Sequence, residues 1–134
     1  MNQTDTIMQD PYFSRVMELA DASVKRFDPA KLKWMWGEAL YTYALSLLDN
    51  ALEQDRYLDF NRAYLDAHIQ KGYRVDQSDT MAPGLTAFAV LQKADNPQYQ
   101  QVVDRVLNYL KHSERVLDYM PNHLGSSLEG KFYP

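Results

Sequence analysis

Two carboxylates three residues apart, Asp76 and Asp79, precede an apolar segment that begins near Pro83. A carboxyl group at the rim of a pocket can act as a general acid or base if burial or a second carboxylate raises its pKa. Asp79 or Thr80 could instead be the N-cap of the helix that we predict over 82–94, since both residue types are favoured there. A helix N-terminus normally lowers the pKa of a carboxyl group, which opposes an acid role. The local sequence leaves both roles open for Asp79.

Two tryptophans and three histidines are further candidates for a site. On a helix, Trp34 and Trp36 would point in different directions, about 200° apart. We therefore expect one in the core and the other along a pocket, where an indole can contact a sugar. His123 lies in a polar segment and is a weaker candidate, because a lone loop histidine is more often a surface or hydrogen-bonded residue. His68 and His112 lie near the ends of predicted helices, where interaction with the helix terminus is the simpler role.

The composition argues against several classes of protein. The 134 residues carry a formal net charge of −4 and their basic side chains form no stripe, which disfavours nucleic-acid binding. There is no cysteine, so disulfides and thiolate chemistry are excluded, and the histidines lack metal-ligand spacing. No glycine-rich phosphate loop or serine nucleophile motif occurs. No apolar run could span a membrane and no signal-peptide pattern is present, so we expect a cytoplasmic protein.

Apolar spacing predicts an all-α protein with a single domain over 1–134. Asp10-Pro11 and Asn96-Pro97 are typical helix starts, and Gly72 is placed to end a helix. The segment 116–134 contains Pro121, Gly125, Gly130 and Pro134, so we predict a long loop there. Helices are predicted over the ranges 11–27, 37–53, 56–70, 82–94 and 97–110.

An internal repeat of about 42 residues organises these helices: it brings Tyr57 onto Tyr99 and Leu65 onto Leu107. The repeat predicts successive helical hairpins, whose connecting loops lie at one end of the array because neighbouring helices alternate in direction. These loops are 28–36, 72–82 and 116–134, so Trp34, Trp36, Asp79 and His123 are expected at the same end. A short helical-repeat module that binds a partner along its helix faces is the alternative interpretation.

Five segments, in order, resemble a known family. They are "KWMWGEALYTYAL", "DRYLDFNRAYLDAHI", "SDTMAPGLTAFAVL", "NPQYQQVVDRVLNYL" and "NHLGSSLEGKFYP". The ordered set is similar to the amino-terminal part of the unsaturated glucuronyl and rhamnogalacturonyl hydrolases, glycoside hydrolase families 88 and 105. This resemblance implies an (α/α)6 barrel with its active site at one end.

The resemblance also implies an activity and roles for named residues. Members of these families remove an unsaturated uronic acid from the end of an oligosaccharide by hydrating the double bond of the sugar, and they need no metal or organic cofactor. Asp79 falls where the family has an active-site acid. Trp36 and His123 fall in segments at the rim of the site, and Trp34 is a further candidate for substrate binding.

One departure from the family pattern affects the expected activity. The second acidic residue of the family is expected shortly after "GKFYP", where this sequence stops. We therefore expect less than half of the barrel helices here, and no hydrolysis unless another chain supplies the rest. An inactive paralogue is a further alternative. Apolar helix faces left without their neighbours would favour self-association.

Overall fold

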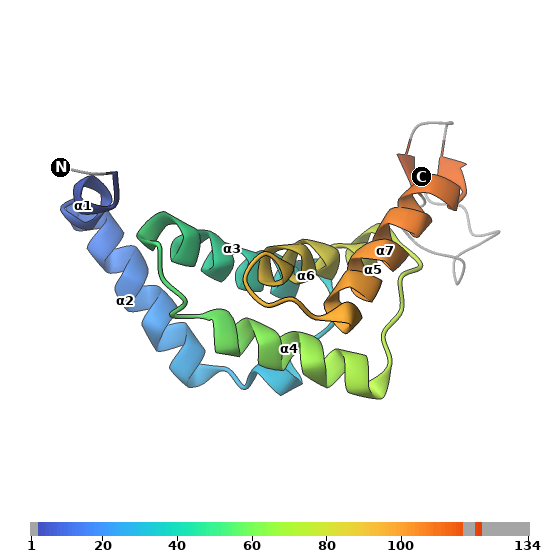
Figure 1. The fold of residues 1–134 in the computed structure, drawn as a ribbon, viewed down its shortest axis with the longest axis horizontal. Helices are drawn as coiled ribbons and strands as arrows, with labels where there is room; N and C mark the ends of the chain where they lie inside the picture. The colour runs from blue at the N-terminus through green and yellow to red at the C-terminus, as the bar shows by residue number, and fades with distance from the viewer. Residues whose placement is uncertain (1–2, 117–119, 122–134) are drawn as a thin grey trace, which may run out of the picture.

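The structure, a computed structural model, describes residues 3–116 and 120–121 (Figure 1). In chain order its elements are α1 (Gln3–Met8), α2 (Pro11–Arg26), the 3-10 helix η1 (Pro29–Lys31), α3 (Trp36–Leu52), α4 (Leu58–Lys71), α5 (Ser78–Met81), α6 (Pro83–Leu91), α7 (Pro97–His112), β1 (Arg115–Val116) and β2 (Met120–Pro121). The all-α fold of helical hairpins predicted from the sequence is confirmed.

Local capping explains where the long outer helices begin. The Asp10 side chain accepts a hydrogen bond from the Tyr12 backbone N–H at 2.8 Å, and α2 starts with a proline. The Asn96 side chain does the same for Gln98 at 2.9 Å at the start of α7. A capping side chain satisfies a backbone N–H group in the first turn that has no partner within the helix. Proline suits the first helical position because it has no N–H group that would need a partner there. Both helix starts agree with the prediction.

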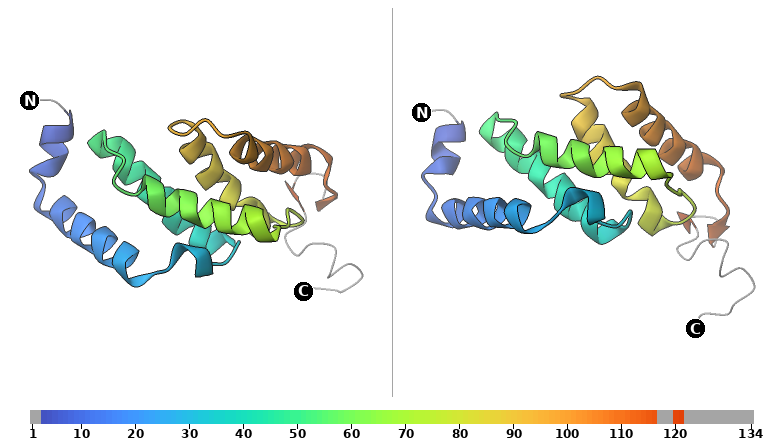
Figure 2. Two further views of the ribbon diagram at one scale, coloured as in Figure 1. Left: turned by 60° about the horizontal axis from the view of Figure 1, so that its bottom comes forward. Right: turned by 90° about the horizontal axis from the view of Figure 1, so that it is seen from below.

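The helices form an array with an inner pair and outer helices around it. Helices α3 and α6 pack together in the middle, α4 lies across both, and α2 and α7 lie at the two ends (Figures 1 and 2). Between the inner helices, the Thr42 and Thr86 hydroxyls are 2.7 Å apart and fully buried. Both hydroxyls also lie within hydrogen-bond distance of the Ala39 carbonyl oxygen, at 3.2 and 3.3 Å, so these buried polar groups are satisfied within the core.

The outer helices are linked by a recurring contact. The Tyr57 hydroxyl donates to Asp21 of α2 at 2.9 Å, and the Tyr99 hydroxyl donates to Asp66 of α4 at 2.7 Å. Burial and the nearby Asp21 carboxylate raise the pKa of Tyr57 to about 12, so this hydroxyl keeps its proton. The 42-residue spacing that relates Tyr57 to Tyr99 therefore corresponds to equivalent joints between successive outer helices.

Three local features differ from the sequence prediction. The helix α1 was not predicted, and neither was the four-residue helix α5 in the segment 72–82, which was predicted as a loop. The strands β1 and β2 pair antiparallel, with Arg115 opposite Pro121, inside a segment that was also predicted as a loop. Residues 117–119 and 122–134 of that segment lie outside the described residues. Among the helices of the described residues, none is long and apolar enough to cross a membrane.

Candidate functional site

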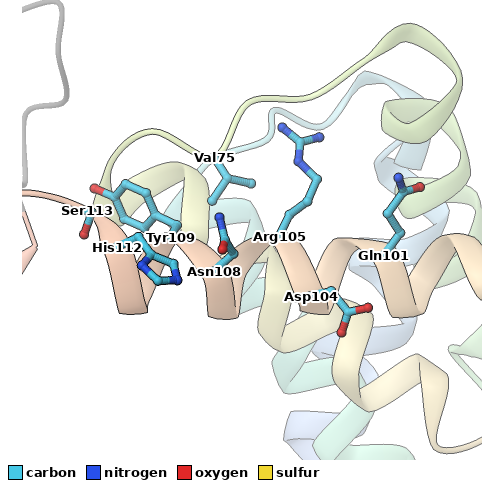
Figure 3. Close-up of a pocket in the computed structure, with 8 residues that line it drawn as sticks. All are labelled: Val75, Gln101, Asp104, Arg105, Asn108, Tyr109, His112 and Ser113. Atoms are coloured by element: carbon cyan, nitrogen blue, oxygen red, sulfur yellow. The ribbon is translucent and has the colours of Figure 1, made fainter.

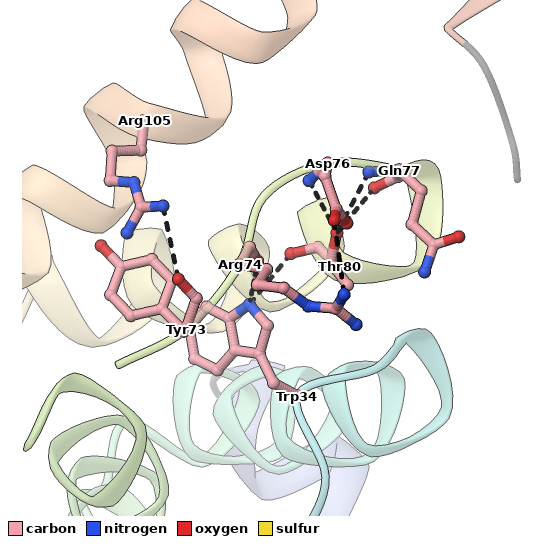
Figure 4. A network of polar contacts seen from close by, with 7 residues as sticks. All are labelled: Trp34, Tyr73, Arg74, Asp76, Gln77, Thr80 and Arg105. Carbon is pink, nitrogen blue, oxygen red and sulfur yellow. Dashed lines mark hydrogen bonds and ion pairs between the residues drawn. The ribbon is translucent and has the colours of Figure 1, made fainter. Parts of the chain in front are cut away.

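The indole of Trp34 closes the loop that leads to Asp79. Its Nε1–H group lies 3.1 Å from the Arg74 carbonyl oxygen and 3.0 Å from the Thr80 carbonyl oxygen, and it donates to both (Figure 4). The side chain is only 8% exposed. One buried donor therefore fixes both ends of the segment 74–80 against the joint between η1 and α3.

Aromatic side chains surround this indole and hold it in place. Trp34 lies against Tyr64, His68 and Tyr73, with ring centroids 5.9, 5.2 and 4.7 Å away. The Tyr64 hydroxyl donates to the Lys33 carbonyl at 3.1 Å, which also secures the backbone next to Trp34. Such aromatic packing contributes about 0.5–1.5 kcal/mol per pair beyond the area that it buries.

His68 has a structural role in this cluster. Its Nε2 atom is 2.7 Å from the Leu32 carbonyl oxygen, and the side chain is only 4% exposed. Burial lowers the pKa of His68, so the neutral imidazole is favoured, with its proton on Nε2 to reach the carbonyl. The last turn of α4 thus anchors the backbone two residues before Trp34.

A polar network shapes the start of α5. The Thr80 hydroxyl accepts hydrogen bonds from the backbone N–H groups of Asp76 at 3.0 Å and Gln77 at 3.2 Å, and it lies 3.1 Å from the Asp76 carboxylate (Figure 4). Arg74 forms an ion pair of 3.6 Å with the same carboxylate. Gln77 is the N-cap of α5 and forms a reciprocal capping box with Thr80. Asp76 is therefore part of the loop framework.

Asp79 lies in the first turn of α5 and is half-buried. The N-cap residues of α5 and α6 are Gln77 and Ala82, so the prediction that Asp79 or Thr80 might be the N-cap is wrong. Pro83 has no N–H and starts a separate helix, which displaces the cap predicted for a single helix over 82–94. Without the capping role, the carboxyl group of Asp79 remains a candidate for chemistry.

The structure brings Trp36 and Asp79 to one end of the array. Trp36 is the first residue of α3 and is 55% exposed, and α3 contacts α5, which carries Asp79. Trp34, in contrast, is in the core, so its indole offers little surface for a sugar. His123 lies outside the described residues. In the part of the chain that the structure describes, no group of acidic or histidine residues could hold a metal ion.

Sequence reasoning did not identify the residues that position Asp79. Arg74 and Thr80 contribute backbone carbonyls to Trp34, and no sequence motif marks a carbonyl acceptor. Gln77 and Thr80 form a capping box in which the usual order of the residue types is reversed, so the common signature did not find it.

The protein is an all-α array of helical hairpins. Its candidate site lies at the end where α3 contacts α5, the helix that carries the half-buried Asp79. The Glycosyl Hydrolase Family 88 model matches residues 12–121. The chain therefore belongs to glycosyl hydrolase family 88, an α/α toroid family that acts on carbohydrates. Searches for similar curated proteins and for similar solved structures found no match.

Proposed function

We propose that this chain contributes Asp79 to the active site of a hydrolase that removes an unsaturated uronic acid from the end of an oligosaccharide. The observation that carries this proposal is the placement of Asp79. Its carboxyl group is half-buried at the start of α5, and the Thr80 carbonyl beside it is fixed by a buried indole. Membership of a carbohydrate-active family supports the choice of substrate class.

In the proposed reaction, the carboxylic acid of Asp79 donates its proton to one carbon of the sugar double bond. Water adds its hydroxyl group to the other carbon, and the water proton returns to the carboxylate. The resulting hemiketal opens, and the glycosidic bond breaks as the sugar is released. General acid catalysis of this kind requires a pKa near the working pH.

Three further groups complete the proposed site. A second carboxyl group, from another segment or another chain, would share the acid and base roles with Asp79. Trp36 provides an exposed indole at the start of the neighbouring α3, where it can pack against a sugar ring. His123 is proposed as an additional sugar contact.

The test is the loss of ultraviolet absorbance when the double bond of an unsaturated uronyl disaccharide is hydrated. We expect the longest polypeptide that the gene encodes to reduce this absorbance, and Asp79→Asn to slow the reaction about 10²–10⁴-fold. Asp95→Asn, an exposed carboxylate between α6 and α7, is the matched control and should leave the rate unchanged. An unchanged rate in Asp79→Asn would remove Asp79 from the mechanism.

A further inference from the structure

A polar groove follows the outer side of α7. It has a volume of about 560 Å³ and lies between this helix and the loop that carries Val75 (Figure 3). Gln101, Arg105 and Asn108 point toward that loop, whereas Asp104 points away from it (Figure 3). None of the residues that line this groove is a candidate for the site around Asp79. Its chemistry therefore requires a separate explanation.

Arg105 is held in a defined position within this groove. Its Nη2 atom donates to the Tyr73 carbonyl oxygen at 3.3 Å, and its guanidinium lies 4.3 Å from the centre of the Tyr73 ring (Figure 4). Tyr73 itself packs against the buried Trp34. A guanidinium has five N–H donors, so a single hydrogen bond to Tyr73 leaves capacity for a ligand. Arginine fixed in this way loses less conformational freedom when it binds a carboxylate.

The neighbours of Arg105 indicate the kind of ligand. Gln101 and Asn108 are exposed, and their amide groups flank the guanidinium along about 10 Å of helix. Amides can both donate to and accept from sugar hydroxyls, while the guanidinium pairs with a carboxylate. A single fixed cation between two neutral amides suits a chain of hydroxyl groups with an occasional carboxylate. It suits nucleic acid less well, because a phosphate backbone calls for several cations.

We infer that the α7 groove, whose lining includes Gln101, Arg105, Asn108 and Val75, is a binding site for an acidic oligosaccharide. Arg105 pairs with a uronate carboxylate and the two amides contact hydroxyl groups of the adjoining units. The choice of an acidic sugar rests on the proposed function. The groove adds a second place of contact with such a chain, and Asp79 is not among its lining residues.

Binding of saturated trigalacturonate tests the inference, since this probe has no double bond and cannot be hydrated. We expect saturable binding by calorimetry in the wild-type protein and a weaker response to neutral maltotriose. Arg105→Gln and Asn108→Asp should each raise the Kd for trigalacturonate at least tenfold. Asn108→Asp keeps the side-chain shape at an exposed position and adds a repelling charge, so its effect does not depend on the contacts of Arg105 with Tyr73. Lys111→Gln, an exposed cation on the same helix outside the groove lining, should leave the Kd unchanged.

The outcomes separate the groove from the proposed reaction. The inference that the groove binds an acidic oligosaccharide is overturned if no saturable binding occurs. It is also overturned if neither Arg105→Gln nor Asn108→Asp changes the Kd. If Asn108→Asp weakens the binding of trigalacturonate, the inferred binding site is supported. This holds even if the protein hydrates no unsaturated disaccharide. Asp79→Asn should abolish hydration and retain trigalacturonate binding, because Asp79 does not line the groove.

Discussion

At the scale of single residues, the conformation around Asp79 depends on a tryptophan that is distant in sequence. Trp34 donates to carbonyl groups 40 and 46 residues later in the chain, and those carbonyls flank the start of α5. Both bonds leave from one N–H group, so a single substitution removes both. A buried carbonyl that loses its donor destabilises the fold, because it has no water to replace the lost hydrogen bond.

Trp34→Phe removes both hydrogen bonds and keeps an aromatic ring, although the smaller ring also fills less of the core. We expect the free energy of unfolding to fall by about 1–3 kcal/mol. We also expect faster hydrogen exchange of the backbone amides in the segment 74–80, because its ends are no longer fixed. Urea denaturation and amide exchange measured by mass spectrometry provide the two readouts.

Trp36→Phe is the control for this experiment. Trp36 is 55% exposed, so its replacement should change the free energy of unfolding by no more than about 0.5 kcal/mol. Equal destabilisation by the two substitutions, or unchanged amide exchange in Trp34→Phe, would contradict the role given to the Trp34 indole.

The tryptophan pair also shows what the sequence can and cannot predict at this scale. The usual burial of tryptophan predicts that one of the pair lies in the core, and the structure buries Trp34 while Trp36 is 55% exposed. The sequence cannot say which ring is buried, because the choice depends on carbonyls of Arg74 and Thr80 that are brought near by tertiary packing. The role of Asp79 as an acid stays a prediction.

At the scale of the helices, α6 and α7 approach each other closely at Gly84. A Cβ atom built at Gly84 would lie 2.8 Å from Cγ2 and 3.2 Å from Cβ of Val106 on α7. A β-branched valine cannot easily move away, because its rotamer within a helix is strongly restricted. The absence of a side chain at Gly84 is therefore what allows these two helices to pack at this distance.

Gly84→Ala should destabilise the protein although alanine favours helix. Forcing a methyl group into a packed helix contact costs about 1–3 kcal/mol, which outweighs a gain in helix propensity of up to about 1 kcal/mol. Thermal unfolding monitored by circular dichroism would show the change as a lower Tm. The same substitution at Gly37, in the first turn of α3, is the matched control, since a Cβ atom there would meet no atom within 4 Å.

The two alanine substitutions should differ in their effect on stability, and only Gly84→Ala should lower it. Gly37→Ala should leave stability unchanged or increase it by up to about 1 kcal/mol, because it reduces the conformational freedom of the unfolded chain. A Gly84→Ala protein as stable as the Gly37→Ala protein would show that α6 and α7 can separate without cost.

The helix boundaries illustrate how far local sequence determines an element. The starts of α2 and α7 are predicted correctly, because their capping side chains and prolines act within one turn. The break between α5 and α6 is missed, because α5 is stabilised by the capping box and by the distant indole of Trp34. Short helices of this kind depend on tertiary contacts more than on the propensity of their residues.

At the scale of the whole molecule, the array has an apolar groove along each lateral edge, one beside α7 and one beside α2. The groove between α6 and α7 has a volume of about 380 Å³, and its lining includes Met81, Leu85, Phe88, Val103, Leu107 and Leu110. The groove between α2 and α3 has a volume of about 330 Å³, and its lining includes Val16, Leu19, Phe27, Tyr41, Ala44 and Leu48. Within the described residues, neither groove is covered by a further helix, so both edges of the array expose apolar surface to solvent.

Two different apolar edges on one molecule favour head-to-tail association. Because the edges are not the same surface, a contact between them leaves one edge of each kind open and permits growth beyond a dimer. We predict that the 134-residue chain by itself shows a molar mass that rises with concentration in light scattering. The double substitution Leu85→Asn and Phe88→Ser should lower that mass toward the monomer, because these side chains are 46% and 53% exposed in the groove between α6 and α7.

Tyr12→Ser separates the effect of the groove from a general loss of surface hydrophobicity. Tyr12 is 79% exposed and lies outside the lining of both grooves, so its replacement should leave association unchanged. A folded wild-type chain that stays monomeric at high concentration would contradict the predicted association. Equal effects of Tyr12→Ser and the double substitution would show that association does not use the groove between α6 and α7. Loss of association in the double variant alone would identify this groove as the surface through which the copies associate.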